Sequence, residues 1–227
     1  MNRRNFLRAG FAGAAAAGLT LLPAARALAQ YSTSPGLPAS PSGIVVVELA
    51  NLHCPRCRLI NDHFTRLQQA ARDIGQDLRF APVAWEGQSL WPDRVYYATR
   101  DLFPLAEGLV RDAVFDGLQR EGMLFETVSQ VIAYLERRQV PENALKLEPN
   151  FNLAAIAERA GSDDTMLSEA KAGRLVNMSG AVQVPVFVWV KDGQVIKSLS
   201  SRDAPEPISL VQLVYRELTK NVAQPAS

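Results

Sequence analysis

Apolar positions from residue 43 onward first follow an extended pattern and then a helical one. "GIVVVELA" (43–50) is β-branched and apolar on both faces, which predicts a buried central strand. Apolar residues then recur at helical spacing, and this predicts one helix from Pro55 to about Gly75. Residues 78–85 predict a second buried strand, parallel to the first. The positions on the apolar side of the predicted helix are Leu59, Ile60, Phe64, Leu67 and Ala71.

The middle of the chain carries helical periodicity almost throughout. Pro104 suits the first turn of a helix, and residues 105–122, 126–138, 152–161 and 162–177 repeat the helical spacing. Aromatic residues at the same spacing are predicted to be core residues rather than ligand-stacking groups. The predicted stripe of the first helix contains Leu105, Leu109, Val110, Ala113, Val114 and Leu118, and the predicted core aromatics are Tyr96, Tyr97, Phe115 and Phe125.

After Gly180 the pattern becomes extended again. "VPVFVWV" (184–190) predicts a strand, "KDGQ" contains the Asp-Gly pair of a tight hairpin turn, and "VIKSL" predicts the returning strand. An amphipathic helix over residues 206–220 follows. We therefore predict a mixed-sheet α/β domain (residues 43–91 and 177–221), interrupted by an all-helical insertion (92–176) and followed by a short tail (222–227).

The N-terminal segment, residues 1–29, has the pattern of an export signal. "MNRRNFLR" is basic, an Ala/Gly/Leu run follows, and Ala27-Leu28-Ala29 is a small-residue cleavage site. The paired arginines resemble the twin-arginine signal. Retention of the segment as a membrane anchor is the alternative. Export implies a periplasmic or other extracytoplasmic compartment, where disulfides persist, and the Ser/Pro-rich residues 30–42 predict a tether.

Composition and charge narrow the possible partners. With 227 residues, 48% of them hydrophobic, the chain can bury one substantial core. The formal net charge is +1, but residues 1–29 carry four arginines and no acid, so the remainder has a charge of −3. This balance gives no sign of binding to nucleic acid or to an anionic membrane.

The chain has two cysteines, Cys54 and Cys57. If Cys54 begins the predicted helix, Cys57 lies one turn further on the same face, about 5–6 Å away between Cβ atoms, which is compatible with a disulfide. Pro55 lacks an amide hydrogen that the first turn would leave unbonded. The helix start and the guanidinium of Arg56 would lower the pKa of Cys54 below about 8.5, whereas Cys57 should keep a higher pKa. This asymmetry predicts an attacking thiol and a resolving thiol.

Other interpretations of the cysteine pair remain open. Chance spacing is one interpretation. A structural disulfide is another, although a disulfide that closes so short a loop removes little entropy from the unfolded chain. Both histidines, His53 and His63, are near the pair, so a non-enzymatic copper or zinc site built from the two cysteines and His53 is a third.

The residues around the pair resemble the DsbA family of thiol–disulfide oxidoreductases, which have the thioredoxin fold with a helical insertion. The resemblance rests on "VVVELANLHCPRC", on "VFDGLQREG" within the helical block, and on "VQVPVFVWVKDG" far downstream of the cysteines. It extends over residues 43–220.

The resemblance implies roles for particular residues. Cys54 would be the nucleophile and Cys57 its buried partner, with Glu48 as a buried acid that exchanges a proton with Cys57. Glu48 facing solvent on an edge strand is the alternative. Val184 and Pro185 match the loop with a cis proline that binds substrate backbone in this family.

Two residues depart from the family pattern. Arg56 stands where the best-known oxidases have histidine, so thiolate stabilisation should persist without a histidine-linked pH response. Gln183 stands where many relatives have glycine. His53 would either orient the active site or lie on the surface without a role.

The expected function is a dithiol oxidase that donates the Cys54–Cys57 disulfide to client proteins. A reductase or isomerase running the same chemistry in reverse is the alternative. The resemblance implies that the disulfide is the redox centre and that no further cofactor is bound. It also implies a membrane partner of the DsbB type that reoxidises the cysteine pair. We expect the protein to be a monomer.

Overall fold

The computed structural model describes residues 40–220. The predicted signal (1–29), most of the predicted tether and the predicted tail (222–227) lie outside the described residues. The last residues of the predicted tether are held in place: the Ser40 and Ser42 hydroxyls donate hydrogen bonds to the Gly75 carbonyl at 2.7 and 2.9 Å.

A four-stranded mixed sheet forms the centre of one half of the molecule. It consists of β1 (Ile44–Ala50), β2 (Asp77–Pro82), β3 (Val186–Lys191) and β4 (Gln194–Ser200) in the order β2-β1-β3-β4. The β1–β2 pair is parallel, and the β1–β3 and β3–β4 pairs are antiparallel. Strand β1 is therefore central, as its run of apolar residues predicts.

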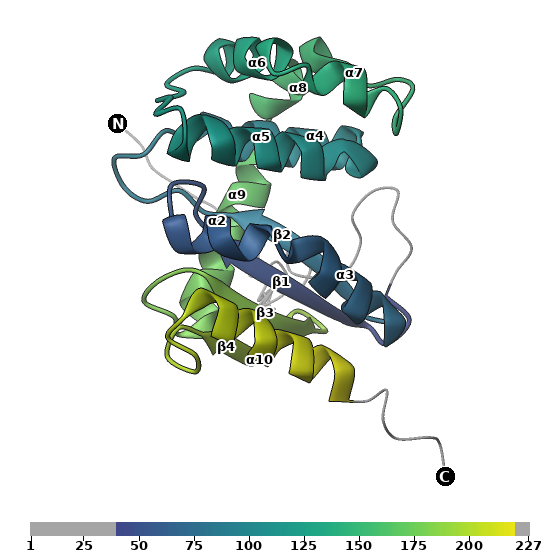
Figure 1. Cartoon of the computed structure of the whole chain (residues 1–227), viewed down its shortest axis with the longest axis vertical. Helices are drawn as coiled ribbons and strands as arrows, with labels where there is room; N and C mark the ends of the chain where they lie inside the picture. The colour runs from purple at the N-terminus through teal and green to yellow at the C-terminus, as the bar shows by residue number, and fades with distance from the viewer. Residues whose placement is uncertain (1–39, 221–227) are drawn as a thin grey trace, which may run out of the picture.

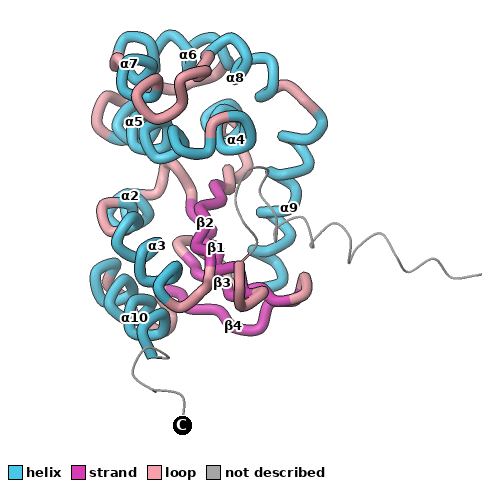
Figure 2. The backbone as a smooth tube through the Cα atoms, turned by 90° about the vertical axis from the view of Figure 1, so that its right-hand side faces the viewer, coloured by secondary structure: helices cyan, strands magenta, loops and turns pink. Residues whose placement is uncertain are grey.

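Helices cover both faces of this sheet (Figures 1 and 2). The helices α2 (Pro55–Asn61), α3 (Phe64–Asp73) and α10 (Pro207–Thr219) lie together on one face. On the other face lies α9 (Asp163–Ser179), which contacts all four strands and also α4. One continuous helix therefore crosses the domain boundary predicted at residue 176.

The remaining helices form a separate layer beyond the end of the sheet (Figure 1). The sheet and this separate helical layer together confirm the predicted fold, a thioredoxin-like sheet domain with a helical insertion. It contains α4 (Trp91–Leu102), the short 3₁₀ helix η1 (Pro104–Ala106), α5 (Glu107–Gln119), α6 (Val128–Arg137), α7 (Val140–Ala144) and α8 (Leu153–Ala160). In the part of the chain that the structure describes, no helix is both long and apolar enough to cross a membrane.

The four aromatics predicted as core residues are all buried, so that prediction is confirmed. Phe80 of β2 links the two halves of the molecule. Its ring packs edge-on against Phe64 of α3, Tyr96 of α4 and Phe115 of α5, with centroids 5.2–6.0 Å apart. Because aromatic pairs of this kind add about 0.5–1.5 kcal/mol each beyond their burial, this cluster fixes the insertion on the sheet domain.

The prediction of a single helix from Pro55 to Gly75 is wrong. The chain turns at Asp62 and His63, where the His63 amide donates to the Ile60 carbonyl at 2.9 Å instead of continuing the α-helical pattern. The helices α2 and α3 are therefore separate, and Leu59, predicted on the buried side, is 50% exposed. Spacing alone cannot detect such a break, because the apolar period continues across it.

Two smaller predictions also need correction. Leu105 is 61% exposed because it lies in the 3₁₀ helix η1, before the buried stripe of α5 begins. The second strand ends at Pro82 rather than Trp85, and Trp85 is 41% exposed. The last backbone bond to the central strand is donated by the Val83 amide to the carbonyl of Ala50 at 2.7 Å, and β1 ends at Ala50, so no partner strand continues towards Trp85.

Replacing Gly117 of α5 by alanine should destabilise the insertion. A Cβ atom there would lie 2.6 Å from Cζ of Phe125 and 3.0 Å from Cζ of Tyr134, closer than unbonded carbon atoms normally approach. We expect a loss of about 1–3 kcal/mol in the free energy of unfolding, measured by denaturant titration. Gly173→Ala in α9 is the matched control, because its Cβ would meet no atom within 4 Å. An unchanged stability of Gly117→Ala would contradict the packing described here.

Candidate active site at the start of helix α2

The loop between β1 and α2 places Cys54 at the start of the helix. Asn51 holds this loop: its side-chain oxygen accepts from the His53 amide at 2.8 Å, and its carbonyl accepts from the Cys54 amide at 2.9 Å. Its side-chain nitrogen donates to the Val83 carbonyl at 2.7 Å. Asn51 is 1% exposed, and we did not single it out from the sequence. An Asn shortly before the chain turns into a helix is a recognisable signal.

Cys54 is the N-cap of α2 and Pro55 follows in its first turn, in agreement with the predicted helix start. Cys54 is partly exposed, whereas Cys57 is completely buried one turn further along. Both residues are thiols in this structure. The pair therefore presents one accessible sulfur at the mouth of a helix and one protected sulfur beneath it.

The two thiols differ strongly in acidity. A hydrogen bond from the Cys57 side chain, together with those from the Cys57 and Arg56 amides and the Arg56 charge, outweighs partial burial and lowers the pKa of Cys54 to about 6. Burial, and then the proximity of Cys54, raise the pKa of Cys57 well above its usual range. At neutral pH, Cys54 is mainly a thiolate and Cys57 remains a thiol.

The charge of Arg56 contributes the smallest of these effects on the pKa of Cys54. Its guanidinium donates to the carbonyl of Pro205, just before α10 begins. The position of Arg56 is thus fixed between α2 and the start of α10, and the backbone amides at the helix start contribute more to the thiolate than its charge does.

The predicted loop opposite the cysteines lies beside Cys54. The Val184–Pro185 peptide bond is cis, and both residues are buried. The Cys54 sulfur lies 3.9 Å from the Val184 carbonyl oxygen, within the range of a weak thiol hydrogen bond. Gln183, just before this loop, is exposed and its side chain bonds to Ser201. With Gln183 turned towards Ser201, the Val184 carbonyl lies next to the accessible sulfur of Cys54.

Glu48 lies inside the protein rather than on an edge strand. Its side chain is completely buried on β1, and neither carboxyl oxygen has a hydrogen-bond partner among residues 40–220. Burial raises the pKa of Glu48 to about 8, although the charge of Arg111 lowers it and that of Cys54 raises it. Glu48 also raises the pKa of Cys57. The carboxyl can therefore gain or lose a proton near neutral pH.

His53 is half-buried, and burial lowers its pKa. Its Nε2 atom is buried and has no hydrogen-bond partner in the described part of the chain. Within residues 40–220, no group of three or more His, Cys, Asp and Glu side chains is arranged to hold a metal ion.

Gln119 of the insertion is a second residue that we did not single out from the sequence. Its side-chain nitrogen donates to the carbonyls of Leu52 and Cys54 at 2.7 and 3.2 Å. The helix α5 thereby supports the active-site loop directly. No sequence signal points to this contact, because Gln119 and Cys54 are far apart along the chain.

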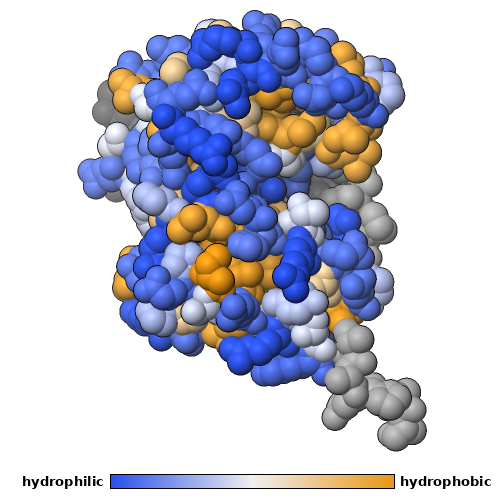
Figure 3. All heavy atoms as spheres, in the orientation of Figure 1, coloured by the Kyte–Doolittle hydropathy of each residue, from blue (hydrophilic) through white to orange (hydrophobic). Residues whose placement is uncertain are grey.

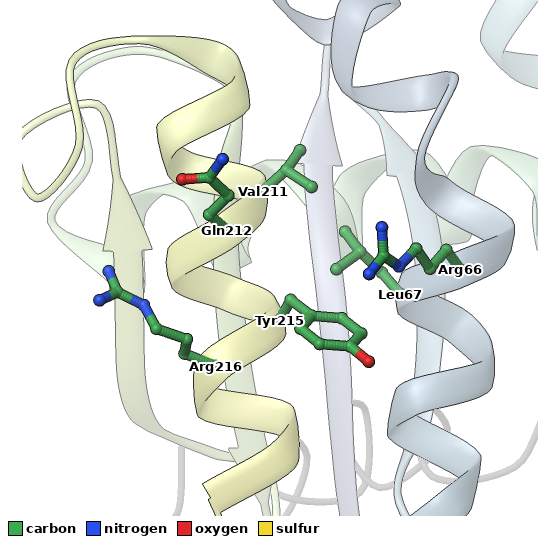
Figure 4. A pocket seen from close by; sticks show the side chains of 6 residues that line it. All are labelled: Arg66, Leu67, Val211, Gln212, Tyr215 and Arg216. Atoms are coloured by element: carbon green, nitrogen blue, oxygen red, sulfur yellow. The ribbon is translucent and has the colours of Figure 1, made fainter.

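Two surface features lie along α10. Hydrophobic residues gather over the region of α2 and α10 in Figure 3. On these helices, Leu59 of α2 and Ile208 of α10 are 50% and 45% exposed. Further along α10, a hollow of about 350 Å³ opens towards α3 (Figure 4). In it, the Arg66 guanidinium stacks on the Tyr215 ring at 4.8 Å. The hollow contains neither cysteine, and it is lined by Arg66, Leu67, Val211, Gln212, Tyr215 and Arg216.

Comparison with known proteins gives structural matches only. No family model matches the sequence, and no curated protein matches it either. Among solved structures, a Pseudomonas aeruginosa DsbA variant is similar with a TM-score of 0.60 and 18% identity, over 83% of this chain and 92% of that chain. NmDsbA1 from Neisseria meningitidis is similar with a TM-score of 0.57 and 14% identity, over 83% and 90%.

A third match is the Proteus mirabilis DsbA in complex with a non-covalently bound peptide. It has a TM-score of 0.55 and 15% identity, over 79% of this chain and 89% of that chain. These matches extend over both the sheet domain and the insertion. The chain has the fold of the DsbA proteins, a thioredoxin-like domain with an inserted helical subdomain.

Proposed function

We propose that this protein is an exported thiol–disulfide oxidoreductase that acts as a dithiol oxidase. The observation that carries the proposal is the contrast between an accessible Cys54 of pKa about 6 and a buried Cys57 of raised pKa on the same helical turn. An exchange enzyme needs this pair of properties, because one sulfur must meet the client and the other must close the bond. The DsbA-like fold supports the same conclusion.

The reaction begins with the Cys54–Cys57 disulfide. A client thiolate attacks the Cys54 sulfur, which forms a mixed disulfide and releases Cys57 as a thiolate. Glu48 then gives its proton to Cys57, because it is the carboxyl whose charge affects Cys57. A second client thiolate attacks the client sulfur of the mixed disulfide, and Cys54 leaves as a stabilised thiolate. The client has lost two electrons, and the enzyme holds them as a dithiol.

The surface around Cys54 suits an extended client chain. The buried Val184 and Pro185 lie on one side of Cys54, and the Val184 carbonyl is 3.9 Å from its sulfur. The apolar surface over α2 and α10, with the exposed Leu59 and Ile208, lies on the same two helices that Arg56 joins. Backbone contacts at Val184 and apolar contacts at this surface would hold a partly folded client. The peptide bound to the Proteus mirabilis protein supports this kind of substrate.

The acidity of Cys54 favours the oxidase over the reductase. Interactions that stabilise the thiolate stabilise the reduced enzyme, and therefore make its disulfide a stronger oxidant. The sign follows from the lowered pKa: the stabilisation is complete above the pKa of an ordinary thiol and is lost as the pH falls through about 6. A pair with this acidity should transfer its disulfide to clients at neutral pH.

The remaining parts of the proposal concern location and partners. The twin-arginine pattern supports export to the periplasm, where the pair would be reoxidised by a membrane protein of the DsbB type. The redox centre is the cysteine pair itself, with no further cofactor, and the protein would act as a monomer.

The direct test is oxidation of a reduced, unfolded client by the oxidised protein. We expect one client disulfide to form for each Cys54–Cys57 disulfide consumed, and the pair to be reduced more readily by glutathione than an ordinary structural disulfide. A strongly negative reduction potential, with reduction of client disulfides instead, would contradict the oxidase and favour the reductase.

A further inference from the structure

The buried carboxyl of Glu48 has two aromatic neighbours in the sheet. It is paired in register with Phe80 of β2 on one side and with Phe187 of β3 on the other. Paired residues of neighbouring strands project from the same face, so the carboxyl lies between two phenylalanine side chains. A carboxyl in such a site receives neither a hydrogen bond nor a charge from these two neighbours.

The positive charge near Glu48 comes instead from the helical insertion. Arg111 of α5 is 4% exposed, and its guanidinium carbon lies 4.3 Å from the centre of the Phe64 ring and 5.2 Å from that of Phe80. Phe80 is the neighbour of Glu48 in the sheet. The guanidinium and the carboxyl thus lie near the same ring, one contributed by the insertion and the other by the sheet domain.

Arg111 is not neutralised by a close hydrogen-bonded acid. Its Nε atom is buried without a hydrogen-bond partner in the described region, and Asp112, whose side chain is 58% exposed, is 3.7 Å away. Glu107 of α5 and Tyr96 of α4 also interact with its charge. The charged groups that act on the pKa of Glu48 are Arg111 from α5 and Cys54 at the start of α2, and Glu48 in turn raises the pKa of Cys57.

We propose that Arg111 is a positioning residue that sets the protonation of Glu48, and through it the proton transfer with Cys57. This inference rests on the proposed function. The helical insertion would then supply the positive charge near Glu48 that Phe80 and Phe187, its paired neighbours in the sheet, do not provide. Without Arg111, the carboxyl would retain only the effects of burial and of Cys54, which both oppose its ionisation.

The step most sensitive to this effect is closure of the enzyme's own disulfide. Reduced protein reacts with an aromatic disulfide such as dithiobis-nitrobenzoate: the Cys54 thiolate attacks, and one thionitrobenzoate leaves. Cys57 then gives its proton to Glu48 and attacks the Cys54 sulfur, and the second thionitrobenzoate leaves. The Cys54–Cys57 bond forms as the mixed disulfide breaks, and the rate of the second release follows the ionisation of Glu48.

The test measures the rate of this second release against pH in purified protein. In Arg111→Met, which retains a long apolar stem between the two rings, the apparent midpoint should rise by about one pH unit, and the rate below the midpoint should fall by about tenfold. Arg111→Lys should keep the wild-type midpoint, because it keeps the charge. If Arg111→Met does not fold, Arg111→Gln takes its place as the neutral variant.

Two controls separate this effect from a general structural one. Arg100→Met removes another largely buried arginine of the insertion and should leave the midpoint unchanged, whatever it does to stability. In a Glu48→Gln background, Arg111→Met should cause no further shift. The inference is overturned if the folded neutral variant keeps the wild-type midpoint, or if its shift persists without the Glu48 carboxyl. Absence of the second release in the wild type would instead count against the proposed function.

Discussion

Replacing Cys54 by serine should reduce disulfide transfer to a reduced client to the uncatalysed rate, while leaving the fold intact. A serine hydroxyl is not ionised at neutral pH and cannot form the mixed disulfide on which the reaction depends. Cys54 is partly exposed and its contact to Val184 is long, so its loss should cost little stability. The measurement is the rate of client thiol loss with oxidant supplied in excess.

The matched comparison is His53→Asn, which changes the residue immediately before the nucleophile and leaves both sulfurs in place. This variant should keep most of the transfer rate. A Cys54→Ser protein that still oxidised the client at the wild-type rate would show that the exchange takes place elsewhere.

Replacing Cys57 by alanine should convert the protein from one that releases its clients into one that retains them. When the variant is offered an oxidised client, which is the reverse of the oxidase reaction, Cys54 can still attack the client disulfide and release one client thiolate, but no second enzyme thiol remains to attack the Cys54 sulfur and free the client. A covalent complex should therefore accumulate and be visible without reductant by electrophoresis or intact mass. Alanine suits the fully buried position, so the fold should be retained.

The same substitution should raise the pKa of Cys54 from about 6 towards that of an ordinary thiol. The hydrogen bond from the Cys57 side chain is the largest cause of the lowered value, and alanine removes it. Cys57→Ser is the matched control, because its hydroxyl can still donate to the thiolate. Equal Cys54 pKa values in the alanine and serine variants would contradict this cause.

Much of the fold could be predicted from the sequence, because its elements are strongly periodic. The buried run of β1, the hairpin with the Asp-Gly turn and the long helical block each have a pattern that few other structures satisfy. The break at Asp62 and His63 could not be predicted, because the apolar spacing of the sequence continues through it. The break depends on how α2 and α3 each pack in the folded protein. The short helix α7 spans too few residues to have a period.

The candidate site also contains residues that could be predicted from the sequence and residues that could not. Cys54, Pro55 and Cys57 are local, and their spacing predicted a helix start with two sulfurs on one turn. Asn51 was missed although an Asn just before a helix start is a recognisable signal, whereas the bond of Gln119 to the loop backbone carries no sequence signal. Arg111 was missed for another reason: its neighbours Phe64 and Phe80 are distant in the sequence, and only the folded chain brings them together.

In the proposed mechanism, the helical insertion takes part in the chemistry of the site. Gln119 donates a hydrogen bond to the carbonyl of Cys54, and the charge of Arg111 lowers the pKa of the buried Glu48. Both residues lie on α5, and Gln119 falls within the stretch (114–122) whose sequence resembles the DsbA insertion. Changes in α5 should therefore alter the active site as well as stability.

The most direct test of the account is a pH titration of the Cys54 thiolate in the reduced protein, followed by its ultraviolet absorbance, with Cys54→Ser as the blank. We expect a single ionisation with a midpoint near pH 6, well before any ionisation of Cys57. A midpoint near about 8.5, the value of an ordinary free thiol, would contradict it.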